Sequence, residues 1–297
     1  MRFINPLYVR SFAIVSFAVV MRADERTQDL TDRLASEAEA FQKIAPEMVG
    51  RETLHQGALT APPRFTIRVG DASKQRAAAV WREREMVSEY GFALLAGREI
   101  HELRQVTSID GKPVTGESKA QEALAKLVTG SDDQRKRVAL QQFEKFGLRG
   151  GATDFGQILL LFSRGRLERY EFTAAGPRLL GRVPAQVFRY QQLDGPQALT
   201  VFRGNSNGGS GPQPQRLNVQ GEIWVRESDG LPLRITMKAT DNSADEPVRE
   251  EATVDYAMSE FGTLLPVETT QRESRGDQQL AENHFTYSGF HRFRTQH

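Results

Sequence analysis

The chain has 297 residues, a formal net charge of +1 and a mean hydropathy of −0.49. The near balance of charge excludes a strong electrostatic attraction to nucleic acid or to acidic surfaces, and the hydropathy argues against an integral membrane protein. With no cysteine, the chain has no disulfide framework, no thiolate metal site and no thiol for a bacterial lipid anchor.

Residues 1–23 have the organisation of a secretory signal peptide. Arg2 and Arg10 precede the apolar run Ser11–Val20, which has signal-peptide length and is too short to span a bilayer. Ala23 suits the last position before a cleavage site. We therefore predict a periplasmic or secreted protein without a transmembrane span; an uncleaved interfacial anchor and a merely apolar N-terminus are the alternatives.

Residues 24–63 are predicted as a helix followed by a linker. Apolar residues recur three or four positions apart in Asp24–Ala45, and Pro46 ends the pattern. The apolar stripe is narrow, so this helix should lie on another element. Glu47–Pro63 is polar and bounded by prolines, which favours a linker or crossing segment.

An initial β-meander is predicted for residues 64–113. Trp81–Leu95 and Arg98–Ile109 are rich in β-forming residues, with Ala96-Gly97 as the turn between them, and Asp110–Pro113 forms another turn. A further strand before them is indicated by the alternation of Phe65, Ile67 and Val69 with polar residues.

Three glutamates on the first of these strands share a face, namely Glu83, Glu85 and Glu89. Such a cluster could suggest a metal site or acid–base chemistry. A solvated sheet face, with Arg82, Arg84 and Arg104 nearby, is the favoured interpretation.

Helices are predicted in the middle of the chain. Ser118–Phe146 reads as two helices, with a capping box at Ser118-Lys-Ala-Gln121 and a stop at Gly130. A short helix, Phe155–Phe162, follows and is capped by Asp154. Apolar residues cover most of its circumference, so it should be buried against the sheet.

The C-terminal half is predicted to be a series of strands. Leu167–Thr173 and Arg182–Leu193 precede a flexible loop at Gly204–Gln215. After the loop, Asp229-Gly230 lies between two alternating runs and predicts a hairpin, in which Leu231, Leu233, Ile235 and Met237 share one face. The further strands are Glu251–Met258, Leu264–Glu273 and His284–Phe293.

No convergent set of catalytic residues is present. Gly204–Gly208 matches the G-x-S-x-G pattern of a nucleophile elbow, and Asp277 and His284 follow it, but the pattern enters a Gly/Pro loop with no helix after it. The five histidines include no helical i, i+4 pair, and a zinc site needs three or four ligands that meet in space. We therefore expect no enzyme activity, no metal and no cofactor.

These elements predict an α+β fold. A long, curved, mostly antiparallel sheet, an unclosed half-barrel, would bury its apolar face by wrapping over a few helices. The N-terminal helix and the β-meander would precede it. Either the helices fill the space against this face, or part of it stays open to an apolar ligand.

Several strand and turn patterns resemble the envelope lipoprotein-carrier (LolA/LolB-like) superfamily. They are Gly221–Ile235, Val254-Asp-Tyr256, Leu265-Pro-Val267 and Tyr287–Phe293. The resemblance implies a LolA-like α+β domain, here over residues 64–297, in an uncharacterised long secreted member. It also implies a lipid or lipoprotein as partner.

The function predicted from these observations is non-catalytic binding of a hydrophobic ligand, a lipid or a lipoprotein acyl chain. The candidate contact residues, chosen for apolar character and strand position, are Phe188, Trp224, Leu233, Ile235, Phe285 and Tyr287. An equal case exists for simple core packing of these residues. The alternative function is a cell-envelope protein-interaction or stress-sensor module with a solid core.

Overall fold

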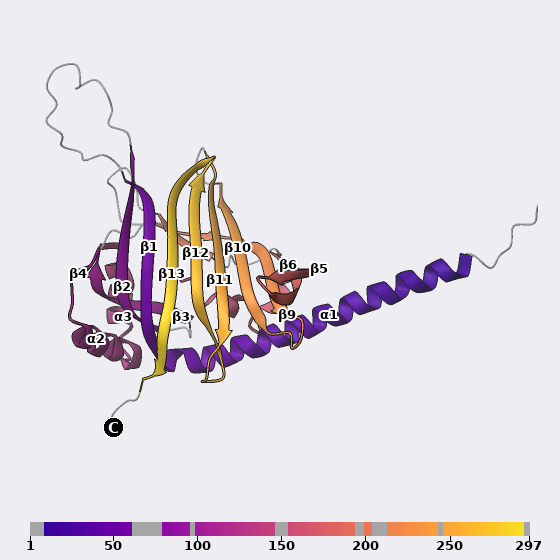
Figure 1. The fold of residues 1–297 in the computed structure, drawn as a ribbon, viewed down its shortest axis with the longest axis horizontal. Coiled ribbons are helices and arrows are strands. Elements are labelled where there is room, and N and C mark those ends of the chain that lie inside the picture. Colours follow the sequence, from indigo (N-terminus) through magenta and orange to yellow (C-terminus); the bar gives the residue numbers. More distant parts are fainter. Residues whose placement is uncertain are drawn as a thin grey trace, which may run out of the picture.

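The structure is a computed structural model that describes residues 9–60, 79–95, 99–145, 154–193, 199–203, 213–242 and 246–293. Its main feature is one 11-stranded sheet in the order β4-β3-β2-β1-β13-β12-β11-β10-β9-β6-β5, and every pairing in it is antiparallel (Figure 1). The end strands β4 and β5 do not pair with each other, so the sheet is unclosed. A separate two-stranded sheet consists of β7 and β8.

The strands have the following bounds: β1 Met48–Thr60, β2 Val80–Leu95, β3 Glu99–Ile109, β4 Lys112–Pro113, β5 Tyr170–Leu180, β6 Val183–Gln192, β7 Leu199–Arg203, β8 Gln213–Leu217, β9 Gln220–Arg226, β10 Pro232–Asp241, β11 Val248–Met258, β12 Leu264–Arg275 and β13 Gln278–Arg292. The α-helices are α1 Val9–Ile44, α2 Glu117–Thr129 and α3 Asp133–Lys145, and short 3₁₀ helices are η2 Ala45–Glu47, η4 Ile158–Phe162 and η5 Leu167–Arg169. The predicted large, unclosed, antiparallel sheet is confirmed. The described part of the chain is mostly β, with three α-helices.

The prediction of a linker at Glu47–Pro63 is wrong, because these residues contain the strand β1 near the centre of the sheet. β1 pairs with β2 on one side and with the C-terminal strand β13 on the other. Its alternation is concealed in the sequence, since Glu52 and Gln56 occupy positions that are buried in the fold. The first and last strands of the sheet therefore lie side by side at its centre (Figure 1).

The predicted N-terminal helix is confirmed as the C-terminal part of α1. Leu34, Ala38 and Phe41 are fully buried, and the ring of Phe41 meets that of Phe92 on β2 edge-to-face at 5.1 Å. α1 begins at Val9, well before the predicted start at Asp24, and its N-terminal part extends away from the sheet (Figure 1). The structure does not test cleavage of residues 1–23.

The strands of the predicted meander are β2 and β3. Asp110 and Gly111 both have positive φ, at 49° and 72°, as a tight hairpin turn between β3 and β4 requires. The Ala96-Gly97 turn and the alternating run Phe65–Val69 lie outside the described residues. The three glutamates share a face as expected, but Arg104 is on the other side of the sheet.

The two middle helices are confirmed as α2 and α3. The capping box at Ser118 is wrong, because α2 begins one residue earlier, with Gly116 at the N-cap and no side-chain cap bond. α3 is capped instead by Asp132, whose Oδ1 accepts the Arg135 backbone N–H at 3.1 Å.

The predicted apolar helix at Phe155–Phe162 is a turn followed by the 3₁₀ helix η4. Asp154 does not cap it; its carboxylate lies 2.9 Å from Nδ1 of His101 on β3. Burial against the sheet is confirmed, since Phe155, Leu159 and Phe162 are almost completely inaccessible to solvent.

The C-terminal strands occur in the predicted order. Gly230 has a φ of +67° in the turn between β9 and β10, as the Asp-Gly signal predicts. The segment Leu167–Thr173 is a 3₁₀ turn followed by the start of β5. Most of the Gly204–Gln215 loop lies outside the described residues, and its last three residues begin β8.

The sheet has two distinct faces. One face packs against α1 and η4 in a single buried cluster, and we call it the core face. Its side chains include Leu54, Tyr90, Ile235 and Phe285. The second face carries a smaller cluster at the start of β1, where Val49 and neighbouring strand residues pack against α2 and α3.

Candidate functional site

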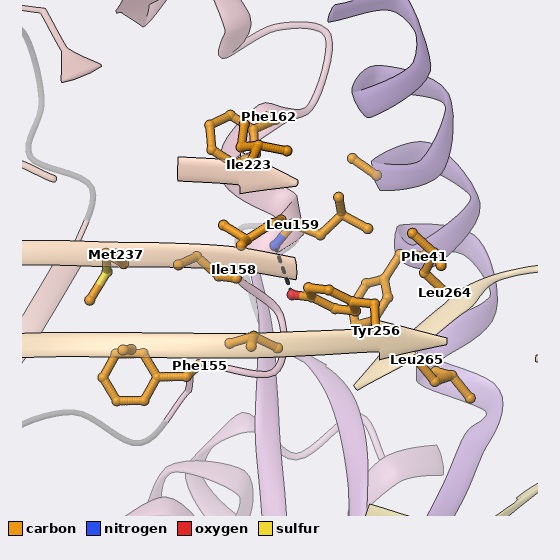
Figure 2. Packing of buried hydrophobic residues seen from close by; sticks show 14 of the residues in the cluster. Phe41, Phe155, Ile158, Leu159, Phe162, Ile223, Met237, Tyr256, Leu264 and Leu265 are labelled. Carbon is orange, nitrogen blue, oxygen red and sulfur yellow. Dashed lines mark hydrogen bonds between the residues drawn. The ribbon is translucent and has the colours of Figure 1, made fainter. Parts of the chain in front are cut away.

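Four of the six predicted contact residues lie together in the buried cluster of the core face. They are Phe188, Ile235, Phe285 and Tyr287, on β6, β10 and β13. Phe285 and Tyr287 are stacked, with ring centroids 6.5 Å apart and an interplanar angle of 9°. The same cluster includes Phe41, Leu159 and Tyr256, which Figure 2 shows packed against one another.

The other two predicted residues do not join them. Trp224 pairs across strands with Val187 and Arg234 and lies on the second face, where the Arg178 guanidinium carbon is 5.4 Å from its ring centroid. Leu233 is the extra residue at a register shift between β9 and β10 and is only partly buried.

The apolar part of the core face is covered by residues 154–162, which we call the 154–162 segment. Two hydrogen bonds from one side chain hold its backbone. The Tyr256 hydroxyl donates to the Gly156 carbonyl at 3.0 Å and accepts the Leu159 N–H at 3.2 Å, the second bond being the dashed line in Figure 2. The Gln157 N–H donates to Oε1 of Glu102 at 3.2 Å. A segment with few regular backbone bonds is thus fixed by groups of the sheet.

Beside this segment lies a buried charge cluster, which consists of Glu52 on β1 and Glu102 and Arg104 on β3. Nε of Arg104 donates to both carboxylate oxygens of Glu52, at 2.8 and 3.0 Å, and Nη2 donates to Oε2 of Glu102 at 2.6 Å. The guanidinium also lies 5.3 Å from the Tyr90 ring centroid and 5.6 Å from that of Phe285. The pairing of each charge is what makes such deep burial tolerable.

Burial controls the protonation of this cluster. Desolvation raises the pKa of Glu102 to about 8. The Arg104 charge acts in the opposite direction, whereas the nearby carboxylates of Asp154 and Glu52 raise the pKa further. Desolvation also raises the pKa of Glu52. For Arg104, burial alone would lower the pKa, but the Glu52 and Glu102 charges outweigh it and hold it well above the usual value. Burial thus favours the protonated form of Glu102, in which the Glu52 and Arg104 charges balance each other.

A ladder of amides continues along the core face. Gln56 donates to Asn283 at 2.8 Å, Asn283 donates to Gln271 at 2.6 Å, and Gln271 donates to Glu250 at 2.8 Å. These four side chains come from four adjacent strands and are at most 3 % exposed. The core face thus combines an apolar region with a polar region whose side chains are joined by hydrogen bonds.

Sequence reasoning missed the charge cluster. The signal is local: Glu102 and Arg104 lie at every second position between Ile100 and Val106, so all four residues share one face of the strand. Glu52, the partner of Arg104, is 52 positions away from it and lies in the segment predicted as a linker. The Glu89 carboxylate lies 3.8 Å from Arg51, on the second face.

Among the described residues, no group of three or more His, Asp or Glu side chains is arranged to hold a metal ion. The G-x-S-x-G pattern at residues 204–208 lies outside them. His55 and His284 are cross-strand partners with ring centroids 6.5 Å apart, and each has one carboxylate close to it. In the same part of the chain, no helix combines the length and the apolar character needed to cross a membrane.

Comparison with known proteins finds similar solved structures at low identity. A DUF1329 family protein from Desulfovibrio piger has 9 % identity and a TM-score of 0.34, over 89 % of this chain and 92 % of that one. A Vibrio parahaemolyticus domain described as an outer membrane lipoprotein-sorting protein has 9 % identity and a TM-score of 0.34, over 87 % and 93 %. A LolA superfamily protein from Nitrosomonas europaea has 10 % identity and a TM-score of 0.30, over 88 % and 93 %.

The superfamily that the sequence patterns resemble is thus among the structural neighbours. No family model matches the chain, and no curated protein matches it.

Proposed function

We propose that the protein is a non-catalytic envelope protein that binds a lipid or a lipoprotein acyl chain on the core face of the sheet. In this proposal the sheet acts as a half-barrel around α1 and the 154–162 segment, and the chain is exported to the periplasm or secreted. The contact residues would be Phe188, Ile235, Phe285 and Tyr287. Trp224 and Leu233, which lie away from them, would take no part in the first contact.

One observation carries the proposal. The broad apolar face of the sheet packs against α1 and against the 154–162 segment, which is a turn followed by a short 3₁₀ helix. The backbone of this segment depends on Tyr256 and Glu102 for its contacts with the sheet. An acyl chain that took the place of Leu159 and Phe162 would bury a comparable apolar area, so the exchange would be nearly balanced.

The experiment is to purify the protein from its envelope, extract it with organic solvent and identify bound lipid by mass spectrometry. The stripped protein is then titrated with a fluorescent fatty acid, and unlabelled lipids are used as competitors. We expect a stoichiometric apolar species and saturable probe binding. A protein that is free of lipid and does not bind the probe would rule out the proposal.

A second candidate, a protein-interaction or stress-sensor module with a solid core, is favoured by the tight packing. Leu159, Phe162 and Ile235 are all 0 % exposed, so the core face is already occupied by the chain itself. This module would bind one envelope protein in a stoichiometric complex, and the fatty acid probe would not compete with that protein for binding. A pull-down from envelope extract, with and without the probe, separates the two functions.

A further inference from the structure

A concave site lies on the second face of the sheet, away from the core face where we propose that a lipid binds. Residues of β1, β2, β12 and β13 line a cavity of about 620 Å³ that is shallow and open to solvent. This volume is within the roughly 300–1,000 Å³ of small-molecule sites. α2 and α3 cover the start of β1, whereas the cavity lies towards the other end of that strand, around His55 and Gly57.

The indole of Trp81 forms an apolar wall of this cavity. It lies across Gly57 on the neighbouring strand, and a Cβ at Gly57 would be only 2.4 Å from Cζ2 of the ring. The absence of a side chain at Gly57 is what allows this position. Trp81 nevertheless stays 38 % exposed. A tryptophan held against a strand while part of its surface remains in water is suited to a ligand with both apolar and polar surface.

Two hydrogen-bonded pairs of side chains, Arg272–Glu282 and His284–Glu268, line the cavity. Arg272 donates to Glu282 at 2.7 Å, Gln279 donates to the same carboxylate at 3.0 Å, and His284 lies 2.9 Å from Glu268. Partial burial acts in the opposite direction, but the hydrogen bonds from Arg272 and Gln279 lower the pKa of Glu282. The cavity therefore presents planar donors and acceptors that are fixed in position.

We propose that this cavity is a saccharide-binding site, in which an uncharged sugar ring stacks on Trp81 and its hydroxyls bond to the paired Arg272, Glu282, His284 and Glu268. The C–H groups of a sugar ring are weakly positive and are attracted by the negative face of the indole. Hydroxyl groups can both donate to carboxylates and accept from a guanidinium. A sugar thus bonds to the site without breaking its internal hydrogen bonds.

Other ligand classes fit the cavity less well. An acyl chain would cover the carboxylates and the guanidinium without replacing their bonds to water, which is unfavourable. A charged peptide would have to compete with the internal pairs Arg272–Glu282 and His284–Glu268. A neutral saccharide avoids both costs.

The test is calorimetric titration of the full chain with three neutral oligosaccharides: cellotriose, maltotriose and N,N′,N″-triacetylchitotriose. We expect saturable binding of at least one of them. Trp81→Ala should weaken it about tenfold or more, as expected for loss of an aromatic stacking surface. The matched control is Trp224→Ala, which removes the other tryptophan from the same face outside the cavity and should leave the affinity unchanged.

Two further measurements distinguish loss of the stacking surface from misfolding of the variant. Trp81→Phe keeps an aromatic ring and should retain part of the affinity, and thermal unfolding of each variant shows that the fold persists. In a Trp224→Phe background, the emission of Trp81 alone should shift on sugar addition.

Three results would overturn the proposal. They are the absence of saturable heat with all three oligosaccharides, equal loss of affinity in Trp81→Ala and Trp224→Ala, and Trp81-dependent binding of an oligolysine peptide but of no sugar. Probe binding on the core face is measured separately, so failure here leaves the lipid proposal standing.

Discussion

Replacing Tyr256 with phenylalanine removes a single oxygen atom that makes two hydrogen bonds to the 154–162 segment. The ring remains, so the apolar packing of Figure 2 is preserved. The Gly156 carbonyl and the Leu159 N–H, however, lose their partner while they stay buried. The variant therefore weakens the attachment of the segment and leaves the sheet itself unchanged.

The magnitude follows from the two groups left without a partner. An unsatisfied buried donor or acceptor costs roughly 1–3 kcal/mol, so the docked segment should lose at least about 2 kcal/mol. If a ligand enters only when the segment leaves, its apparent affinity rises by the same free energy, which is roughly 30-fold for 2 kcal/mol. The free energy of unfolding should fall by a similar amount.

The assay combines urea unfolding with titration of the fluorescent fatty acid. Tyr190→Phe is the matched control, because the Tyr190 hydroxyl is also buried but donates to the Thr236 carbonyl on β10, not to the segment. The control should lose about 1 kcal/mol of stability and keep the wild-type probe affinity. Equal probe affinity in Tyr256→Phe and the wild type would refute the idea that the segment must leave.

Three other predictions concern the stability of the fold. Burial raises the pKa of Glu102 to about 8, above the unfolded value of about 4.5. The stability that this shift contributes is fully present below pH 4.5 and is lost as the pH rises through about 8. Glu102→Gln should therefore reduce the fall in urea midpoint between about pH 5 and pH 9. Arg104→Leu leaves the Glu52 carboxylate buried without its ion pair and should lower the free energy of unfolding by about 3–5 kcal/mol, with an unchanged midpoint contradicting the pairing. Gly221→Ala places a Cβ 2.0 Å from the Thr236 carbonyl oxygen and should cost about 1–3 kcal/mol, measured by thermal unfolding against Gly165→Ala, where the added Cβ meets nothing within 4 Å.

Much of the sheet follows from the sequence because its strands alternate. In β10, Ile235 and Met237 are buried and Lys238 is exposed, as the period of two predicts. The same rule separates Trp224 from Ile223 and Val225 on β9. Trp224, predicted as a contact residue from its apolar character and strand position, therefore lies on the opposite face from Ile223.

The remaining features depend on contacts that are distant in the sequence. β1 is a central strand only because the last strand of the chain, β13, pairs with it. The Glu52–Arg104 pair also joins different strands, so its formation depends on register, which sequence composition does not give. Buried polar residues such as Glu52 and Gln56 make a core strand resemble a polar linker in the sequence, because their partners lie on other strands.

The 154–162 segment contacts both the apolar core and the charge cluster, and this provides a test that separates the two candidate functions. The Gln157 N–H bonds to Glu102, and a Cβ at Gly156 would lie 2.8 Å from the same carboxyl oxygen, so the segment helps to keep water from Glu102. If a ligand displaces the segment, water reaches Glu102, its pKa falls from about 8 towards the usual range, and a proton is released at pH 7. Calorimetry of probe binding in buffers of different ionisation enthalpy measures that proton, and Glu102→Gln is the control that cannot release it. Binding without proton release in the wild type would mean that the segment stays docked, as the solid-core module requires.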